Sequence, residues 1–111
     1  MELGASETER SLVMATFISL VNFTQQGIAN FKDSPERAAK FKAMAEKAGV
    51  TVKEVYWTIG VHDVVLVLDA PDDETVAAVM LSLGSLGNVR TQTLRGFSSS
   101  EMKEIISKVP S

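Results

Sequence analysis

The residues best suited to chemistry lie near the middle of the chain, where His62, the single histidine, is followed by Asp63. A carboxylate beside an imidazole can orient the ring for general-base work. Adjacent residues of a turn rarely point the same way, however, and a turn aspartate commonly accepts hydrogen bonds from nearby backbone N–H groups. The pair therefore has two interpretations: a ligand-binding site, or a polar hairpin tip.

Aromatic residues precede this pair and arginines follow it. Tyr56 and Trp57 are neighbours on a predicted strand and must point to opposite faces. Either ring could form a wall for a flat ligand, or could pack in the core or at a subunit interface. Arg90 could bind a carboxylate through two parallel hydrogen bonds, or could be a solvated charge on an edge strand. The predicted ligand-binding residues are His62, Asp63, Tyr56 and Arg90, and none of them is predicted to be catalytic.

The sequence lacks the side chains or the charge that several other kinds of site require. The chain has no cysteine, which excludes thiolate metal ligands and cysteine nucleophiles. A single histidine would leave carboxylates to complete a metal site, so we predict neither a metal nor a cofactor. The 111 residues carry a formal net charge of -3, which argues against a general binder of nucleic acid or anionic membranes. No apolar run approaches the roughly 20 residues needed to span a bilayer, and a cytoplasmic location is expected.

The elements that must position these residues follow from hydrophobic patterning. Strands are predicted over 15–23, 50–59, 64–69 and 88–97, and helices over 35–48, 72–83 and 98–109, with a short helical turn over 24–31. The expected N-caps are Thr24, Ser34, Asp72 or Asp73, and Ser98, which forms a capping box with Glu101. The side chains expected beneath the sheet are Phe41, Met44, Val79 and Leu83. The first and third strands are apolar on both alternating faces, which is typical of central strands. The fourth alternates with polar residues, which suits a sheet edge. Strict alternation in the second strand places Val52 on the same face as Tyr56.

This order of elements favours an α+β fold of the ferredoxin-like type. In that βαββαβ sandwich, two helices cover one face of a four-stranded antiparallel sheet, and here a C-terminal helix is added. Residues 14–109 form the single predicted domain. Residues 1–13 are poor in large apolar side chains and are expected to be a flexible tail. Met14 is an alternative start to Met1, because the periodic pattern begins directly after it.

Several segments together are characteristic of one family. They read ISLVNFT at 18–24, YWTIG at 56–60, APDDE at 70–74 and GSLGNVRTQTLR at 84–95. Over about residues 14–108 the chain resembles the GYD-domain family of small, mostly prokaryotic proteins. The Gly-x-Tyr-Asp motif of that family corresponds to residues 60–63, where Gly60 and Asp63 match and His62 replaces the tyrosine.

The resemblance implies a dimeric α/β barrel, in which two ferredoxin-like sheets pack face to face. The patterning points the same way, because the sheet face opposite the helices would expose apolar residues of both central strands. A second copy of the chain is the expected cover for that face. Tyr56 is predicted to lie on it, with Trp57 beneath the helices.

The expected function is that of a small homo-oligomeric domain that binds a small apolar or planar ligand or has a regulatory role. One alternative is a cofactor-independent oxygenase or isomerase that acts in a cavity between the two sheets. Another is a purely structural oligomer. In each case the expected partner is another copy of the chain, and neither nucleic acid nor a membrane is expected.

Overall fold

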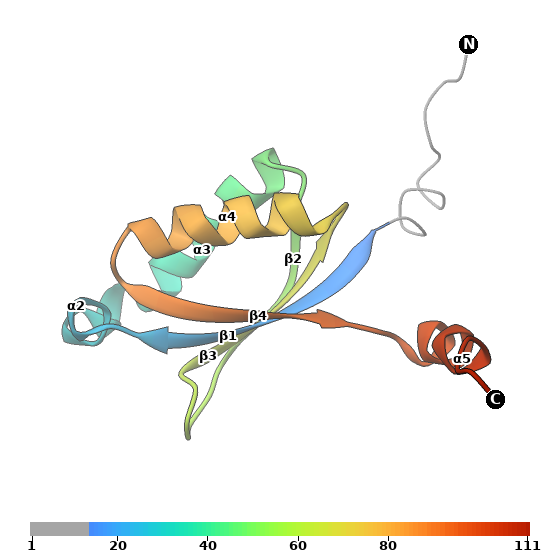
Figure 1. Cartoon of the computed structure of the whole chain (residues 1–111). Helices are drawn as coiled ribbons and strands as arrows, with labels where there is room; N and C mark the ends of the chain where they lie inside the picture. Colours follow the sequence, from blue (N-terminus) through green and yellow to red (C-terminus); the bar gives the residue numbers. More distant parts are fainter. Residues whose placement is uncertain (1–13) are drawn as a thin grey trace, which may run out of the picture.

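The computed structural model describes residues 14–111 of the chain, and the tail predicted over residues 1–13 lies outside them. A four-stranded antiparallel sheet forms one layer, and two helices form a second layer on one of its faces (Figure 1). The strands are β1 (Ala15–Phe23), β2 (Thr51–Trp57), β3 (Val64–Ala70) and β4 (Val89–Gly96). The helices are α2 (Gln25–Ala29), η1 (Phe31–Asp33), α3 (Ser34–Lys47), α4 (Asp73–Ser85) and α5 (Ser99–Ser107). The strand order β2-β3-β1-β4 confirms the ferredoxin-like prediction, with β1 and β3 in the centre.

Local capping signals set where the helices begin. Asp72 accepts a hydrogen bond from the backbone N–H of Thr75 at 2.7 Å. Hydrogen bonding by the side chain of Thr75, and then by its backbone, lowers the pKa of the Asp72 carboxyl. Thr24 starts α2 by accepting from the N–H of Gly27 at 3.1 Å, as predicted. Ser34, the predicted N-cap of α3, is instead the first residue of the helix, because η1 runs directly into it. Its hydroxyl is therefore available for a contact outside the helix.

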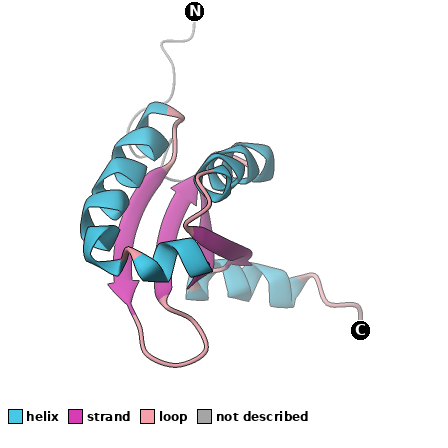
Figure 2. Cartoon of the chain, turned by 90° about the vertical axis from the view of Figure 1, so that its left-hand side faces the viewer, coloured by secondary structure: helices cyan, strands magenta, loops and turns pink. Residues whose placement is uncertain are grey.

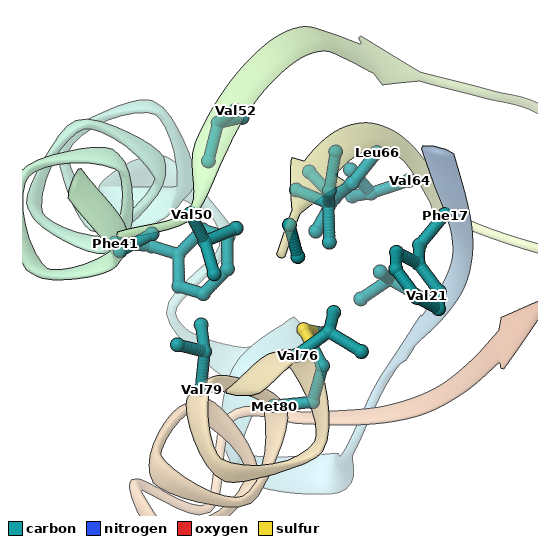
Figure 3. Close-up of a cluster of buried hydrophobic side chains, with 13 residues drawn as sticks. Phe17, Val21, Phe41, Val50, Val52, Val64, Leu66, Val76, Val79 and Met80 are labelled. Carbon is teal, nitrogen blue, oxygen red and sulfur yellow. The ribbon is translucent and has the colours of Figure 1, made fainter. Parts of the chain in front are cut away.

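The hydrophobic core lies between the sheet and the helix pair α3 and α4. Figure 3 shows Phe41 of α3 beside Val50, with Val79 of α4 opposite. Of the residues predicted to be buried here, Phe41 and Val79 are buried, whereas Met44 and Leu83 are only half-buried. The buried cluster consists of Phe17, Val21, Phe41, Ala45, Val50, Val52, Val64, Leu66, Leu68, Ala70, Val76, Val79 and Met80.

A β-bulge in β2 corrects the predicted alternation of that strand. Val52 pairs with Leu68 and Glu54 pairs with Val67, so Lys53 is an extra residue without a partner in β3. The extra residue reverses the parity, and Val52 is buried on the helix side rather than sharing the face of Tyr56. Beyond the bulge the prediction holds, with Glu54 and Tyr56 on one face and Val55 and Trp57 on the other.

The opposite face of the sheet, here called the free face, is covered by no other element within residues 14–111. Figure 1 shows α5 leading away from the end of β4 rather than folding back beneath the sheet. The centre of the free face is apolar, and polar residues surround it. By strand register the free face contains Thr16, Ile18, Leu20, Asn22, Glu54, Tyr56, Val65, Val67, Arg90, Gln92 and Leu94.

The projecting helix α5 depends on a capping box. The hydroxyl of Ser98 accepts from the N–H of Glu101 at 3.1 Å, and the carboxylate of Glu101 accepts from the N–H of Ser98 at 2.8 Å. Both are predicted from the Ser-x-x-Glu spacing. Met102 and Ile106 on the apolar side of this helix are exposed. Within residues 14–111, this capping box and an ion pair between Glu101 and Arg95 at 3.6 Å hold the start of the helix.

Ser98→Ala is expected to destabilise α5 by about 1 kcal/mol, because the mutation leaves the N–H of Glu101 without its partner. Amide hydrogen exchange in α5 should accelerate by about fivefold, which is the equivalent of that free energy. Exchange in β1 and β3 should not change. Ser100→Ala is the control, since its side chain makes no hydrogen bond within residues 14–111. Equal acceleration in both variants would contradict the capping role.

The helicity of α5 is also expected to depend on pH. The hydrogen bond from the N–H of Ser98 is the main cause that lowers the pKa of Glu101, and the charge of Arg95 adds to it. A carboxyl whose pKa is lower in the folded state stabilises the fold above its ordinary pKa, and this effect is lost as the pH falls through the folded value. Amide chemical shifts of α5 should therefore move toward coil values in acid. In Glu101→Gln this acid transition should be absent.

Candidate functional site

The loop between β2 and β3 carries His62 and Asp63, and hydrogen bonds fasten it to the end of β1. The N–H of Asp63 donates to the carbonyl of Val21 at 2.9 Å, and the Asp63 carboxylate accepts from the N–H of Phe23 at 2.9 Å. The loop spans residues 58–63, longer than the predicted tight turn. The Asp63 carboxylate does bind a backbone N–H group, as the structural interpretation predicted, but that group belongs to β1 and not to its own turn.

His62 lies against a polar residue that the sequence analysis missed. Its Nδ1 is 2.9 Å from Oδ1 of Asn22, and Nδ2 of Asn22 donates to the carbonyl of Val61 at 2.6 Å. Since the amide nitrogen of Asn22 is the donor to Val61, its oxygen accepts, and Nδ1 of His62 carries the proton. Nε2 of the neutral ring is then the acceptor, which can bind a hydroxyl, an N–H group or a proton.

Arg90 lies on the same face as this histidine contact. It pairs with Asn22 across the β1–β4 ladder, so the two side chains are cross-strand neighbours on the free face. His62, Asn22 and Arg90 therefore lie near one another at one end of that face. Asn22 is the one amide side chain in a mostly apolar central strand, and this was the signal that could have identified it.

Tyr56 lies on the free face further along the sheet, opposite Val65, and its side chain is 55% exposed. A hydrogen bond with Glu54, together with repulsion by that carboxylate, raises the pKa of the Tyr56 phenol. Like that of an ordinary tyrosine, this phenol is protonated at neutral pH and can donate a hydrogen bond. Of the four predicted site residues, Tyr56, His62 and Arg90 border the free face, and the carboxylate of Asp63 is engaged by the backbone.

Asp63→Ala is expected to destabilise the domain by about 1–3 kcal/mol, because the N–H of Phe23 would lose its acceptor. His62→Ala should cost less than about 1 kcal/mol, since it removes one hydrogen bond at a partly exposed site. Urea denaturation followed by circular dichroism measures both. A smaller loss for Asp63→Ala than for His62→Ala would contradict the roles assigned to the two side chains.

Trp57 lies on the helix side of the sheet, as predicted, and its indole Nε1 donates to the hydroxyl of Ser34 at 2.9 Å. The ring lines a cavity of about 590 Å³ beside α3 and α4. From the sequence, a cavity was expected only between the sheets of two paired chains. This second location follows from the separation of α3 and α4, which also leaves Met44 and Leu83 half-buried.

Two further observations concern the part of the chain that the structure covers. No group of three or more histidine, aspartate or glutamate side chains comes together there in a way that could hold a metal ion. None of its helices is both long enough and apolar enough to cross a membrane.

Nearly all of the described residues match a known family. The profile of the GYD domain matches residues 17–106. The chain belongs to the GYD domain family. A relative of this GYD domain from Thermus thermophilus is the glutamine synthetase and cystathionine beta-lyase binding protein. It is 40% identical over 82 residues, which cover 73% of this chain and 86% of the relative.

A solved structure matches this GYD domain in fold. The crystal structure of MtbAldR superposes with a TM-score of 0.57 at 16% sequence identity. The match covers 86% of this chain but 60% of MtbAldR, so the GYD domain spans less than two thirds of that protein. The likeness supports the ferredoxin-like architecture described above and carries no further argument.

Proposed function

We propose that this GYD domain is a regulatory binding module that pairs with a second copy through its free face and docks onto a metabolic enzyme. The relative from Thermus supports the second part, since its name describes a protein that binds two enzymes. The observation that carries the proposal is that large hydrophobic side chains remain exposed in both places: Tyr56 and Leu94 on the free face, and Ile59 and Val61 on the β2–β3 loop.

The apolar centre of the free face supports pairing. Ile18 and Leu20 of β1 lie beside Val67 and Val65 of β3, and Leu94 of β4 extends the patch. Apolar surface kept in water costs about 25 cal/mol per Å² relative to burial. A two-fold pair buries the same patch on both chains with one set of contacts. A second copy is thus the simplest cover.

The tip of the β2–β3 loop supports docking onto a different protein. Ile59 is fully exposed and Val61 is 84% exposed, although both are large apolar residues. The carbonyl of Val61 is fixed by Asn22, so the loop is held in place on β1. Figure 1 shows this loop extending beyond the strands, on the side away from α3 and α4. A fixed apolar tip can enter a pocket on a partner with little loss of conformational entropy.

Self-association is tested by analytical ultracentrifugation of the full chain at micromolar concentration. A dimer or a larger closed oligomer is expected. Leu20→Lys should shift it toward monomer, because the charge would be buried between the two faces. Leu81→Lys on the outer side of α4 is the control, since Leu81 is exposed and lies away from the free face. A monomeric wild-type chain would contradict pairing.

Docking is tested with glutamine synthetase and cystathionine beta-lyase from the organism that encodes this chain, each immobilised for biolayer interferometry. Saturable binding to at least one enzyme is expected. Ile59→Ser combined with Val61→Ser should weaken it by about tenfold or more, as expected for anchors of an interface. The double variant should leave self-association intact. Absence of binding to both enzymes by the wild-type chain would contradict docking onto them.

A second candidate function is the binding of a small planar or apolar ligand between the paired faces. The imidazole of His62, the phenol of Tyr56 and the guanidinium of Arg90 favour it, since they supply polar groups around an apolar patch. The same groups would serve a cofactor-independent oxygenase or isomerase, with Nε2 of His62 as the base. Native mass spectrometry of freshly purified protein would detect a retained ligand. Unchanged affinity for that ligand in His62→Ala and Tyr56→Phe would contradict the site.

A further inference from the structure

The helix side of the sheet contains a groove that neither proposal above uses. α3 packs on β2 and α4 packs on β3 and β4, but the two helices scarcely contact each other. Figure 2 shows them standing apart over the strands. The space between them is the cavity of about 590 Å³. Sites for small organic ligands commonly fall in the range of roughly 300–1,000 Å³.

Aromatic and aliphatic side chains from several elements form the walls of this groove. Phe23 comes from β1, Phe41 and Met44 from α3, Trp57 from β2 and Leu83 from α4. Phe41 is almost fully buried, and the hydrogen bond to Ser34 holds the indole of Trp57 in place. The groove therefore presents fixed apolar walls, which suit an aromatic or hydrocarbon body.

One end of the groove is cationic. Arg37 lines it and donates to the carbonyl of Asn30 at 2.9 Å and to that of Gly27 at 3.2 Å. These two bonds orient the guanidinium but use only two of its five N–H donors. Within residues 14–111 no carboxylate lies within 4.0 Å of Arg37, whereas Lys40, which also lines the groove, has Glu36 at 4.0 Å in an exposed pair. The charge of Arg37 is thus oriented and not neutralised.

A neutral donor lies near this guanidinium. Asn88, which also lines the groove, adjoins Gly27 closely enough that a Cβ added there would meet the Asn88 carbonyl oxygen. The side-chain oxygen of Asn88 accepts from Gln26 at 2.9 Å, which leaves its amide N–H₂ group as a donor. Asn88 is therefore a second polar group in the lining of the groove, beside the charge of Arg37.

We propose that this groove binds a small amphipathic organic anion, with its apolar body between α3 and α4 and its single carboxylate or sulfonate group at Arg37. The groove and the free face lie on opposite sides of the sheet. The proposal therefore does not depend on pairing or on docking, and its failure would leave both untouched.

Two dyes that differ in one sulfonate test the proposal on the full chain. 8-Anilinonaphthalene-1-sulfonate carries the anion, and N-phenyl-1-naphthylamine is its uncharged counterpart. Trp57 is the only tryptophan in the chain, so its emission reports directly on the groove wall. The anionic dye should bind one per chain and change the emission of Trp57. Its affinity should exceed that of the uncharged dye by about tenfold, as expected for one charge-assisted hydrogen bond.

Variants separate the groove from other surfaces. Arg37→Gln should weaken binding of the sulfonate dye by about tenfold and leave the uncharged dye within about twofold. Arg37→Lys should restore most of the affinity. Ala38→Leu, which fills the groove, should weaken both dyes. Lys47→Gln is the charge-matched control at the far end of the same helix. Circular dichroism and thermal melting identify any variant that has lost its fold. If Arg37→Gln is such a variant, the dye affinities of Arg37→Lys are compared with those of the wild-type chain instead.

Three results would overturn the proposal. Equal binding of the sulfonate dye to Arg37→Gln and Lys47→Gln would show that the guanidinium does not hold the anion. Weaker binding in Arg90→Gln in place of Arg37→Gln would assign the dye to the free face. Dye binding that disappears as the chain self-associates would show that the occupant of the apolar surface is a second copy.

Discussion

Gly27→Ala is expected to destabilise the domain by about 3 kcal/mol or more, which is at the upper end of the cost of overpacking. A Cβ at this position would lie 1.9 Å from the backbone oxygen of Asn88 and 2.9 Å from its carbonyl carbon. The two segments cannot easily separate, since the N–H of Thr24 donates to the same oxygen at 3.0 Å and the Thr24 hydroxyl donates to the carbonyl of Gly87 at 2.6 Å. Urea denaturation followed by circular dichroism measures the loss.

Gly84→Ala is the matched control for this experiment. Gly84 lies inside α4, and a Cβ added there would meet nothing within 4 Å. Alanine should therefore stabilise the domain by about 0.4–1 kcal/mol through the lower entropy of the unfolded chain. Destabilisation of similar size in both variants would show that the close approach of Gly27 to Asn88 is not the cause.

Phe41→Ala is expected to destabilise the domain by about 3–5 kcal/mol, the usual cost of removing a buried phenylalanine ring. Phe41 is 5% exposed and belongs to the cluster between the sheet and the two helices (Figure 3). Its loss would join the core to the groove beside it, and water entering there should keep the cost near the lower value. Thermal unfolding and urea denaturation both report the change.

The control for Phe41 is Phe31 in η1, whose ring is 56% exposed. Phe31→Ala should change stability by no more than about 0.5 kcal/mol, as is usual for surface positions. A loss below about 1 kcal/mol in Phe41→Ala would contradict its place in the core.

The strand order could be predicted because a strand that is covered on both faces needs apolar residues at nearly every position. β1 and β3 are apolar on both faces, which only a central strand requires, whereas the alternating polar residues of β4 indicate an edge. The N-caps Thr24, Asp72 and Ser98 could also be predicted from the sequence, because an N-cap bonds to a backbone N–H group within three residues of itself.

The features that escaped prediction depend on residues far apart in the sequence. The bulge at Lys53 exists only in the pairing of β2 with β3. The Asp63 carboxylate accepts from the N–H of Phe23, which is 40 residues away in the sequence. The residues around Asp63 therefore could not predict that it binds β1 and not its own turn. The groove arises from the spacing of α3 and α4, and the hydrophobic stripe of each helix is compatible with closer packing.

The two edges of the sheet are protected unequally. At the β2 edge the bulge and the charged side chain of Lys53 interrupt the row of backbone groups that another strand would need. The β4 edge is a regular eight-residue strand, Val89–Gly96, with no register shift in its pairing with β1. Continuous extension of a sheet requires two receptive edges on every copy. With one receptive edge, strand-to-strand association of the folded domain through its sheet edges stops at a pair.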